Sequence, residues 1–305
     1  MRILVVGGTG LIGGHAALYL HSQGHKVTIA GRRAPSDVPA LAALPFLVGD
    51  YLKGGFGLAT LSAFDAIVFA AGSDVRHVPQ GQDADEHLLH ANGNAVPAFA
   101  QLARTAGVKK FVHIGSAYPH IVPPENVAAS PYIRSRQLAA DRVAALASES
   151  FHACSLDPPI VVGTVPGLRT PVFDAYISYA RGELPIPPFA PGGGMNFMST
   201  QSLSEAIAGA LEGGGGESAV SGKSVLVGDQ NMTYKDFMEM FFRAAGNPKT
   251  LPVLDDDHPV MPRAYMYAGE KEVSYEVDKA TWAALGRYRR GDILRAVEEI
   301  VRLHD

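Results

Sequence analysis

The sequence predicts an α/β fold, a doubly wound parallel sheet followed by a smaller C-terminal portion that covers it. In the first half of the chain, short β-branched runs alternate with longer amphipathic stretches, as in parallel strands joined by helices. A glycine-rich segment at residues 7–13 stands between the first such run and the first helical stretch. After about Gly163, prolines and glycines interrupt the chain more often, which indicates a change of architecture.

The expected strands are short apolar runs, at residues 3–6, 27–30, 46–48, 66–70, 111–114 and 152–156. Amphipathic stretches between them predict helices over residues 11–22, 86–105 and 132–147. Gly24 and Gly107 stand just before strands, where a left-handed residue commonly ends the preceding helix.

The second half of the chain is expected to be less regular. Prolines at 185, 187, 188 and 191 precede three glycines at 192–194. Such a segment suits neither a sheet nor a helix, so we expect an ordered loop or a lid. Helical patterns return at 204–212, 234–245 and 291–303, and glycines 213–216 indicate a surface turn.

Composition excludes several classes of protein. With 305 residues, of which 47% are hydrophobic, the chain can bury a large core. A net charge of −4 offers no basic surface to nucleic acid or to an anionic membrane. The apolar run at 3–6 is too short for a signal peptide or a membrane span. The single cysteine, Cys154, lies in an apolar run and is expected to be buried and inert. We therefore expect a cytoplasmic protein with no nucleic-acid or membrane partner.

The glycine segment is the strongest functional signal in the sequence. It reads Gly7-Gly8-Thr9-Gly10-Leu11-Ile12-Gly13, directly after a strand and at the start of a helix. Gly7 and Gly10 allow a tight turn and a close approach to a pyrophosphate, and Gly13 lets the helix pack against the strand. The helix N-terminus then offers N–H groups to the phosphates. This context predicts a Rossmann-type dinucleotide site.

The end of the second strand indicates which dinucleotide binds. An Asp or Glu usually stands there to bind a free ribose 2′-hydroxyl. This chain has Gly31 instead, followed by Arg32 and Arg33. A guanidinium can form two hydrogen bonds to a 2′-phosphate, and the Thr9 hydroxyl could add another. The sequence therefore favours NADP over NAD as the cofactor.

Two further segments are expected to touch the cofactor. Asp50 and Tyr51 close the third strand, where the carboxylate could receive the adenine amino group or could simply form a turn. The small residues Ala70, Ala71 and Gly72 end the fourth strand. They would let the cofactor lie across the carboxyl ends of the strands.

These motifs stand in the order typical of one family. The glycine segment, residues 70–72, Asn92, and segments 111–117, 130–132 and 158–163 follow one another along the chain, with weaker similarity at 196–198 and 204–206. The chain resembles an extended short-chain dehydrogenase/reductase of the NAD(P)-dependent epimerase/dehydratase type. The resemblance implies a cofactor-binding Asn92, and a Pro158–Val161 stretch that lines the nicotinamide amide.

The resemblance also implies the catalytic residues. Ser116 and Tyr132 match the Ser or Thr that binds the substrate oxygen and the Tyr that transfers the proton. The family places Lys four residues after the Tyr, but this chain has Arg136 there. Arg136 keeps a positive charge on the same helical face and can bind the nicotinamide ribose. It stays protonated, so it cannot relay a proton as lysine can. Two possibilities remain open: the pair of Tyr132 and Arg136 is catalytically active, or it has lost its activity.

Neighbouring residues narrow the reaction. Dehydratases of this family carry an acidic pair after the Ser or Thr, whereas Ala117 and Tyr118 follow here. Epimerases usually carry an Asn after the sixth strand, but this chain has none in the stretch 156–159. Asp157 stands where many relatives have Arg. We therefore expect an NADP-dependent oxidoreductase that reduces a carbonyl of a small organic substrate. A non-catalytic NADP-binding sensor or scaffold and a sugar epimerase are the alternatives.

The remaining expectations concern metals, domains and assembly. No metal site is expected, because His87 and His90 lack a third ligand and suit a solvated helix face. His120 is expected on a surface loop, although it could reach substrate. We assign residues 1–163 to the NADP-binding domain and 164–305 to a substrate-binding portion, with segments interleaved between them. By resemblance, the helices at 86–105 and 132–147 could form a homodimer interface.

Overall fold

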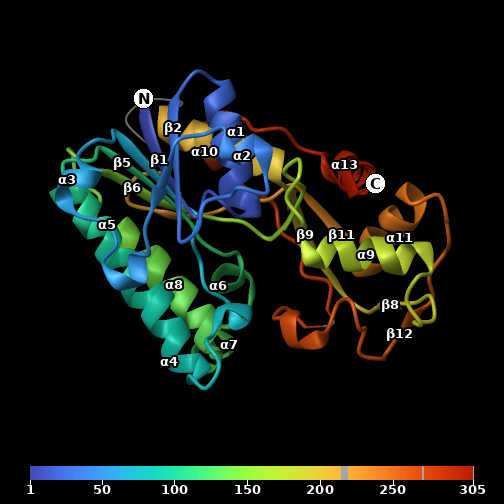
Figure 1. Ribbon diagram of the computed structural model, residues 1–305. Coiled ribbons are helices and arrows are strands. Elements are labelled where there is room, and N and C mark those ends of the chain that lie inside the picture. Colours follow the sequence, from blue (N-terminus) through green and yellow to red (C-terminus); the bar gives the residue numbers. More distant parts are fainter. Residues whose placement is uncertain (214–218, 270, 305) are drawn as a thin grey trace.

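The computed structural model describes residues 1–213, 219–269 and 271–304. Within these residues, a central sheet of seven strands has the order β10-β6-β5-β4-β1-β2-β3, and every pair in it is parallel (Figure 1). Its strands are β1 Arg2–Val6, β2 Lys26–Gly31, β3 Phe46–Val48, β4 Ala66–Phe69, β5 Lys110–Ile114, β6 His152–Asp157 and β10 Ser224–Leu226. The predicted doubly wound Rossmann-type sheet is thereby confirmed.

The strand order creates a crevice beside β1. From β1 the chain builds outward to β2 and β3, and then crosses to β4 on the other side of β1. The connections after β1 and β4 therefore leave the sheet in opposite directions. In open α/β sheets, ligands bind in the crevice that forms at such a switch point, at the carboxyl ends of the strands.

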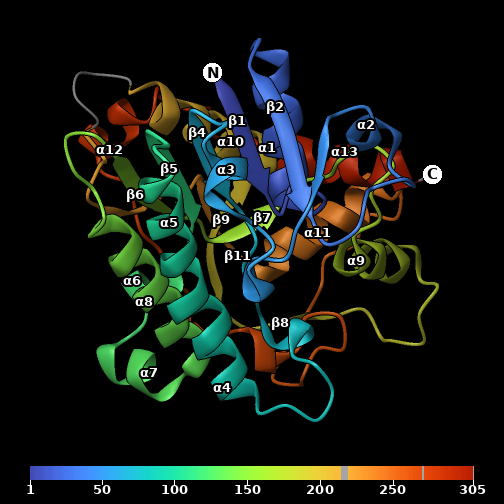
Figure 2. The same ribbon diagram turned by 60° about the vertical axis from the view of Figure 1, so that its left-hand side comes forward.

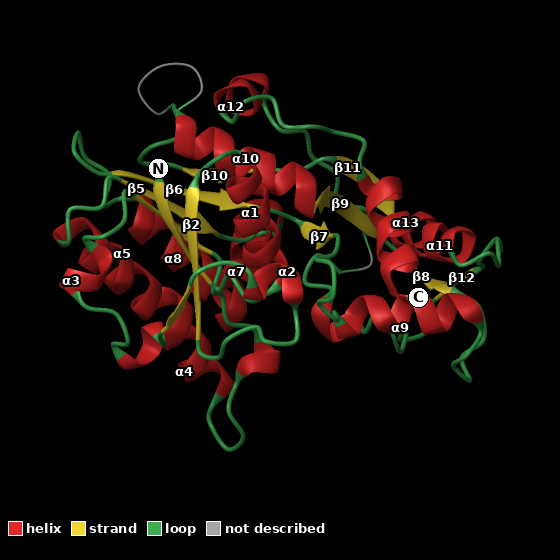
Figure 3. Cartoon of the chain, turned by 45° about the horizontal axis from the view of Figure 1, so that its top comes forward, coloured by secondary structure: helices red, strands yellow, loops and turns green. Residues whose placement is uncertain are grey.

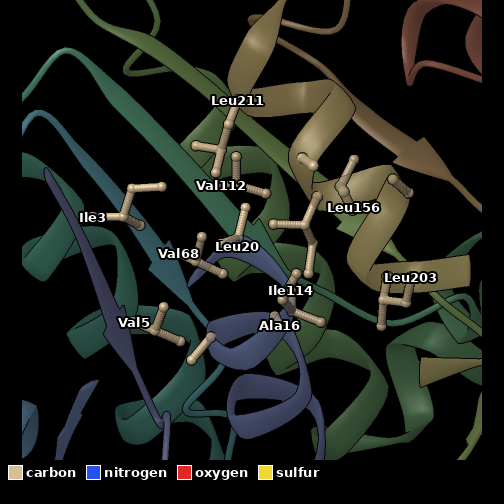
Figure 4. Packing of buried hydrophobic residues seen from close by; sticks show 14 of the residues in the cluster. Ile3, Val5, Ala16, Leu20, Val68, Val112, Ile114, Leu156, Leu203 and Leu211 are labelled. Atoms are coloured by element: carbon tan, nitrogen blue, oxygen red, sulfur yellow. The ribbon is translucent and has the colours of Figure 1, made fainter. Parts of the chain in front are cut away.

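Helices cover both faces of the sheet. On one face, α1 (Leu11–Ser22) packs beside α10 (Thr200–Glu212) (Figure 3). On the other face lie α5 (Ala95–Thr105) and α8 (Pro131–Ala144). Figure 4 shows how side chains of the strands meet those of α1 and α10 in a continuous apolar core; the labelled residues are Ile3, Val5, Ala16, Leu20, Val68, Val112, Ile114, Leu156, Leu203 and Leu211.

The C-terminal part of the chain contributes to both regions of the molecule. α10 and β10 belong to the sheet region, since α10 packs on α1 and β10 pairs with β6. Most other C-terminal elements surround a second core that is rich in Phe and Tyr (Figure 1). They are β7 Ile160–Val162, α9 Pro171–Arg181, β8 Ala190–Pro191, β9 Gly194–Ser199, β11 Gln230–Thr233, α11 Tyr234–Ala244, β12 Val253–Leu254 and α13 Ile293–His304.

Short helices complete the chain. They are α2 Pro39–Ala42, α3 Leu58–Leu61, α4 Ala84–Leu88, α6 Tyr118–Ile121, α7 Pro124–Ala129 and α12 Lys279–Ala284, together with the 3-10 turns Tyr51–Lys53, Val75–His77 and Arg263–Tyr265. In the described residues no helix is long and apolar enough to span a membrane. The Cys154 thiol is buried, and burial raises its pKa to about 12.

Three expected elements differ from the structure. The helix predicted over 86–105 is interrupted by a π-helical segment, Leu89–Asn94, between α4 and α5. The proline-rich stretch predicted to avoid any sheet contains β8, which pairs with β12. Both strands of a two-stranded sheet are edge strands, so Pro191, which lacks a backbone N–H donor, is tolerated in β8. α10 begins at Thr200 rather than 204, since Ser199 Oγ caps it. Most of the turn predicted at 213–216 lies outside the described residues.

Candidate active site

A large cavity runs along the carboxyl ends of the sheet strands. Its volume is about 1260 Å³, which exceeds the range of roughly 300–1,000 Å³ typical of one small-ligand pocket. Its walls come from the loops after β1 to β5, from α8, and from α9 and the segment 259–267 of the C-terminal part. Figure 2 shows α8 and α9 on opposite sides of this region. The cavity is large enough for two ligands side by side.

The glycine loop after β1 forms one end of the cavity. Gly7 has a φ of +81°, and a Cβ there would lie 2.8 Å from the backbone of Ala70 and Ala71. A Cβ on Gly13 would lie 2.3 Å from the Gly7 carbonyl oxygen. Both glycines therefore let backbone segments approach closely. Gly10 is the N-cap of α1 and has no side-chain cap, and a Cβ there would make only an ordinary contact, 3.6 Å from the Gly7 carbonyl oxygen. The first N–H groups of α1 thus meet the cavity wall without a side-chain partner.

The end of β2 brings Gly31 and Arg32 to the cavity beside the glycine loop, but not Arg33. Gly31 is the last residue of β2, and a Cβ there would lie 3.1 Å from Thr9 Oγ1. Thr9 therefore occupies the space where a longer side chain at position 31 would begin. Arg32 is exposed and lines the cavity beside Thr9. Arg33 is also exposed, but it does not contribute to the cavity wall.

Asp50 and Tyr51 line the cavity after β3. Asp50 Oδ1 accepts a hydrogen bond of 3.0 Å from the Leu52 backbone N–H and so caps a 3-10 turn. The Tyr51 ring packs edge-on against Phe69 with centroids 5.1 Å apart. Burial raises the pKa of Tyr51 to about 12, so its phenol is neutral at physiological pH. Asp50 therefore forms a turn, one of the two roles predicted for it. Its Oδ2 atom does not take part in the hydrogen bond that caps this turn.

Ser116, Tyr132 and Arg136 all line the same cavity as the glycine loop. Ser116 follows β5, is 7% exposed, and its Oγ lies 3.4 Å from the Tyr118 backbone nitrogen. Tyr132 is the second residue of α8, and Ser130 Oγ caps that helix at the Ile133 N–H. The end of a strand and the start of a helix therefore bring two hydroxyl groups to one wall.

Arg136 lies one turn further along α8 and is buried, with 6% of its surface exposed. Its Nη2 donates hydrogen bonds of 2.7 Å to the carbonyl oxygens of both Ile114 and Gly115. A Cβ on Gly72 would lie 2.3 Å from Nη1, so the guanidinium fills the space that this glycine leaves open. Burial, together with the nearby Arg136 charge, holds the pKa of His113 well below its usual range. Arg136 is thus the local positive charge, with a neutral histidine behind it.

Asn92 does not line the cavity. Its Oδ1 accepts from the Ser73 N–H at 2.9 Å, and its Nδ2 donates to the Ser73 carbonyl oxygen and to Ser135 Oγ. Ser135 in turn donates to the Tyr132 carbonyl oxygen at 2.7 Å. The side chain therefore ties the loop after β4 to the helix that carries Tyr132 and Arg136. The π-helical turn, which periodicity did not reveal, places Asn92 for this role.

The two histidines predicted on a solvated helix face differ from each other. His90 is exposed, whereas His87 is half-buried with Nε2 3.1 Å from Ser73 Oγ. Both line the cavity. The prediction of a solvated face was wrong for His87, because the loop after β4 folds back onto α4.

Sequence reasoning missed an aromatic corner beside Tyr132. The rings of Tyr132 and Tyr267 stack with centroids 4.9 Å apart and planes at 19°. Tyr118 meets Tyr267 edge-on at 5.1 Å, and burial raises the pKa of the Tyr118 phenol above its usual range. Tyr267 lies in an irregular segment more than a hundred residues after Tyr132. No periodicity or spacing in the sequence could have indicated this contact.

His120 does not line the cavity and forms part of a buried polar network. Its Nε2 lies 2.7 Å from Asp157 Oδ2, and Ser224 also donates to that carboxylate oxygen. Ser155 Oγ bonds Asp157 Oδ1 at 2.6 Å and His113 Nδ1 at 2.9 Å. The hydrogen bond to Asp157 raises the pKa of His120. The buried Asp157 carboxylate is therefore satisfied by groups from β6, β10 and α6.

The fold and the glycine loop define a dinucleotide-binding α/β protein, and comparison with known proteins identifies the family. The model of the NAD dependent epimerase/dehydratase family matches residues 3–213. The chain belongs to this family, whose cofactor is a nicotinamide dinucleotide. The comparison with curated proteins gave no match.

Solved structures show the same fold over the whole chain. A UDP-glucose-4-epimerase from Stenotrophomonas maltophila with bound NAD has a TM-score of 0.78 at 21% identity, covering 99% of this chain and 97% of that one. UDP-glucuronic acid 4-epimerase from Bacillus cereus in complex with NAD has a TM-score of 0.75 at 16% identity, covering 100% of both chains. The Bordetella bronchiseptica enzyme WbmH in complex with NAD+ has a TM-score of 0.71 at 19% identity, covering 99% and 97%.

Proposed function

We propose that the protein is an NADP-dependent oxidoreductase that reduces a carbonyl group of a small organic substrate. One observation carries this proposal: Ser116, Tyr132 and Arg136 line the same cavity as the glycine loop and Arg32. A dinucleotide seated on the glycine loop and extended along the strand ends would reach these three side chains. The cavity volume of about 1260 Å³ leaves room for a second ligand there.

The residues present fit NADP. The lack of a side chain at Gly10 and the uncapped start of α1 suit a pyrophosphate. The absence of a carboxylate at Gly31, with Arg32 beside Thr9, suits a ribose 2′-phosphate. Asp50, Pro158 and Val161 also line the cavity, so the proposed cofactor would place its adenine near Asp50 and its nicotinamide near Pro158 and Val161. The neighbours named above were crystallised with NAD, so the preference for NADP rests on this chain's own residues.

Each polar group has a distinct role in the proposed reduction. Bound NADPH would supply the hydride to the carbonyl carbon. Ser116 Oγ donates a hydrogen bond to the carbonyl oxygen, and the Tyr132 hydroxyl transfers its proton to that oxygen as charge develops. Arg136 lies one helical turn from Tyr132 and supplies a fixed positive charge to the same wall of the cavity. Because Arg136 stays protonated, the phenolate recovers its proton from water that enters the cavity.

NADPH consumption by the purified protein tests this proposal, with Tyr132→Phe as the critical variant. The wild type should oxidise NADPH in the presence of an aldehyde or ketone panel, and Tyr132→Phe should lose about a hundredfold or more in turnover. Wild-type activity that Tyr132→Phe retains in full would refute the assigned chemistry without affecting the cofactor site.

Two other functions have specific support. Arg136 donates to two backbone carbonyl groups, which would suit a non-catalytic NADP sensor or scaffold whose charge is structural. The family and the structural neighbours named as epimerases favour epimerisation of a sugar through transient oxidation. Tight NADPH binding with no turnover on any carbonyl would favour the sensor. Conversion of a nucleotide sugar without net cofactor consumption would favour the epimerase.

A further inference from the structure

The two walls of the cavity differ sharply in chemistry. Every residue that the segment 158–267 contributes to the cavity wall is a proline, an aliphatic or aromatic residue, a methionine or a threonine. All acidic, basic and histidine side chains on the wall come from residues 32–136. The substrate would therefore be covered by a surface that carries no formal charge.

Three basic side chains on the opposite wall already have polar partners. Arg76 and His77 both pair with the carboxylate of Asp74. Arg136 donates to backbone carbonyl groups. Arg32 and Lys53 follow β2 and β3, at the end of the cavity assigned to the cofactor. In the part of the chain that the structure describes, the cavity wall thus offers no cation on the C-terminal side for an anionic substrate.

A nucleotide sugar would fit this surface poorly. Its diphosphate carries negative charge that loses hydration when it is buried. That loss is large unless cations or hydrogen-bond donors replace the water. The wall between 158 and 267 offers only the hydroxyl groups of Thr170 and three tyrosines. The phenols of Tyr176 and Tyr234 have a pKa raised by burial, so they add no charge.

The aromatic corner indicates the shape of ligand that would fit. Tyr267 stacks on Tyr132 and meets Tyr118 edge-on. The Tyr118 hydroxyl approaches Met195 Sδ at 4.0 Å, and Met266 also lines this wall. Flat rings gain from stacked and edge-on partners, and thioethers pack well against ring edges. These groups adjoin Tyr132, the proposed proton donor.

We propose that the substrate of this site is an uncharged carbonyl compound that carries an aromatic ring, and that Tyr267 selects that ring. This inference rests on the proposed carbonyl reduction. It distinguishes the chain from structural neighbours named for nucleotide-sugar substrates. In the reduction, hydride from NADPH forms the C–H bond, Tyr132 gives the proton to oxygen, and the products are an alcohol and NADP+.

A matched pair of ketones tests the charge requirement. The holoprotein, at saturating NADPH, is assayed with 4′-methylacetophenone and with 4-acetylbenzoate, which differ mainly by one negative charge. We expect kcat/KM for the neutral ketone to be higher by about tenfold or more, because the carboxylate has no partner on the wall. UDP-glucose should be neither reduced nor epimerised. Equal or better use of 4-acetylbenzoate, or turnover of UDP-glucose, would overturn the proposal.

Two substitutions on the wall sharpen the test. Tyr267→Ala should lower kcat/KM for 4′-methylacetophenone by about fivefold, while kcat/KM for cyclohexyl methyl ketone changes little. Tyr267→Phe should retain the preference for the aromatic ketone. Val260→Arg places a cation on a half-buried part of the wall, and it should raise the relative use of 4-acetylbenzoate. If Tyr267→Ala affects the aromatic and saturated ketones equally, Tyr267 does not select the ring.

Binding separates this inference from the reduction itself. Calorimetric titration of the NADP+ complex with both ketones measures affinity without turnover. If no carbonyl is reduced but the neutral aromatic ketone binds about tenfold more tightly than 4-acetylbenzoate, the reduction fails and the ligand class stands. If both ketones bind equally or neither binds, the ligand class fails even when another carbonyl is reduced.

Discussion

The Arg136 guanidinium occupies the space that Gly72 leaves open: its Nη1 lies 2.3 Å from the position of a Cβ on Gly72. A side chain at position 72 would therefore displace the guanidinium, which is the flexible end of a long side chain. Gly72 lies in the loop after β4, whereas Arg136 belongs to α8. The contact thus joins the loop after β4 to the helix that carries Tyr132.

Gly72→Ala should lower turnover more than stability. We expect Arg136 to move away from the Ile114 and Gly115 carbonyl groups, with a loss of about ten- to hundredfold in kcat from the misplaced charge. Thermal unfolding and steady-state NADPH oxidation measure the two effects. Gly57→Ala is the control, because a Cβ there meets nothing within 4 Å. A Gly72→Ala protein with native kcat would show that the position of Arg136 is unimportant.

Arg32→Ala should weaken binding of NADPH while leaving that of NADH nearly unchanged. Arg32 lines the cavity beside Thr9, so its loss removes a charged contact to the 2′-phosphate worth about tenfold or more in Kd. Fluorescence titration of both cofactors gives the two affinities. Arg33→Ala serves as the matched control, since Arg33 lies off the cavity wall. Equal affinity of the wild type for both cofactors would contradict the assignment of NADP.

The pair formed by His120 and Asp157 should make stability depend on pH. The hydrogen bond to Asp157 raises the pKa of His120 above its unfolded value of about 6.5. The contribution of this pair is therefore complete below about pH 6.5 and declines as the pH rises through the folded pKa. Urea unfolding of the wild type and His120→Gln from pH 5 to pH 9 should show their difference shrinking with pH. His90→Gln, at an exposed histidine, is the control. A difference that grows with pH would reverse the assigned sign.

Tyr234→Phe should stabilise the protein or leave its stability unchanged. The Tyr234 hydroxyl is buried without a hydrogen-bond partner among the described residues, so removing it recovers a desolvation penalty of about 1 kcal/mol. Tyr179→Phe should have the opposite effect, because the Tyr179 hydroxyl bonds the carbonyl oxygens of Pro187 and Phe189. Denaturant unfolding gives the free energy of unfolding of both variants for comparison with the wild type. A large loss of stability in Tyr234→Phe would mean that its hydroxyl has a partner.

Local sequence patterns predicted the sheet and the glycine loop that forms one end of the cavity. The glycine segment specifies its own turn, because Gly7 needs a positive φ and Gly13 a close backbone approach. The spacing of Tyr132 and Arg136 specifies one helical face. Such features depend on residues that are near one another in the chain, so periodicity and motif spacing reveal them.

Contacts between distant segments could not be predicted in the same way. Tyr267 reaches Tyr132 from an irregular segment whose path depends on the packing of the second core. The π-helical turn that directs Asn92 toward Ser73 and Ser135 carries no signal in hydrophobic periodicity. β8 forms because Val253 and Leu254 supply a partner strand from more than sixty residues away. These features follow from tertiary packing rather than from local propensity.

The most direct test of the proposed function follows the hydride itself. The protein is incubated with NADPH carrying deuterium at both C4 positions and with 4′-methylacetophenone, and the alcohol product is analysed by mass spectrometry. The account predicts one deuterium on the carbinol carbon, formed by the wild type and about a hundredfold more slowly by Tyr132→Phe. An alcohol product without deuterium, or tight NADPH binding with no alcohol from any carbonyl tested, would contradict it.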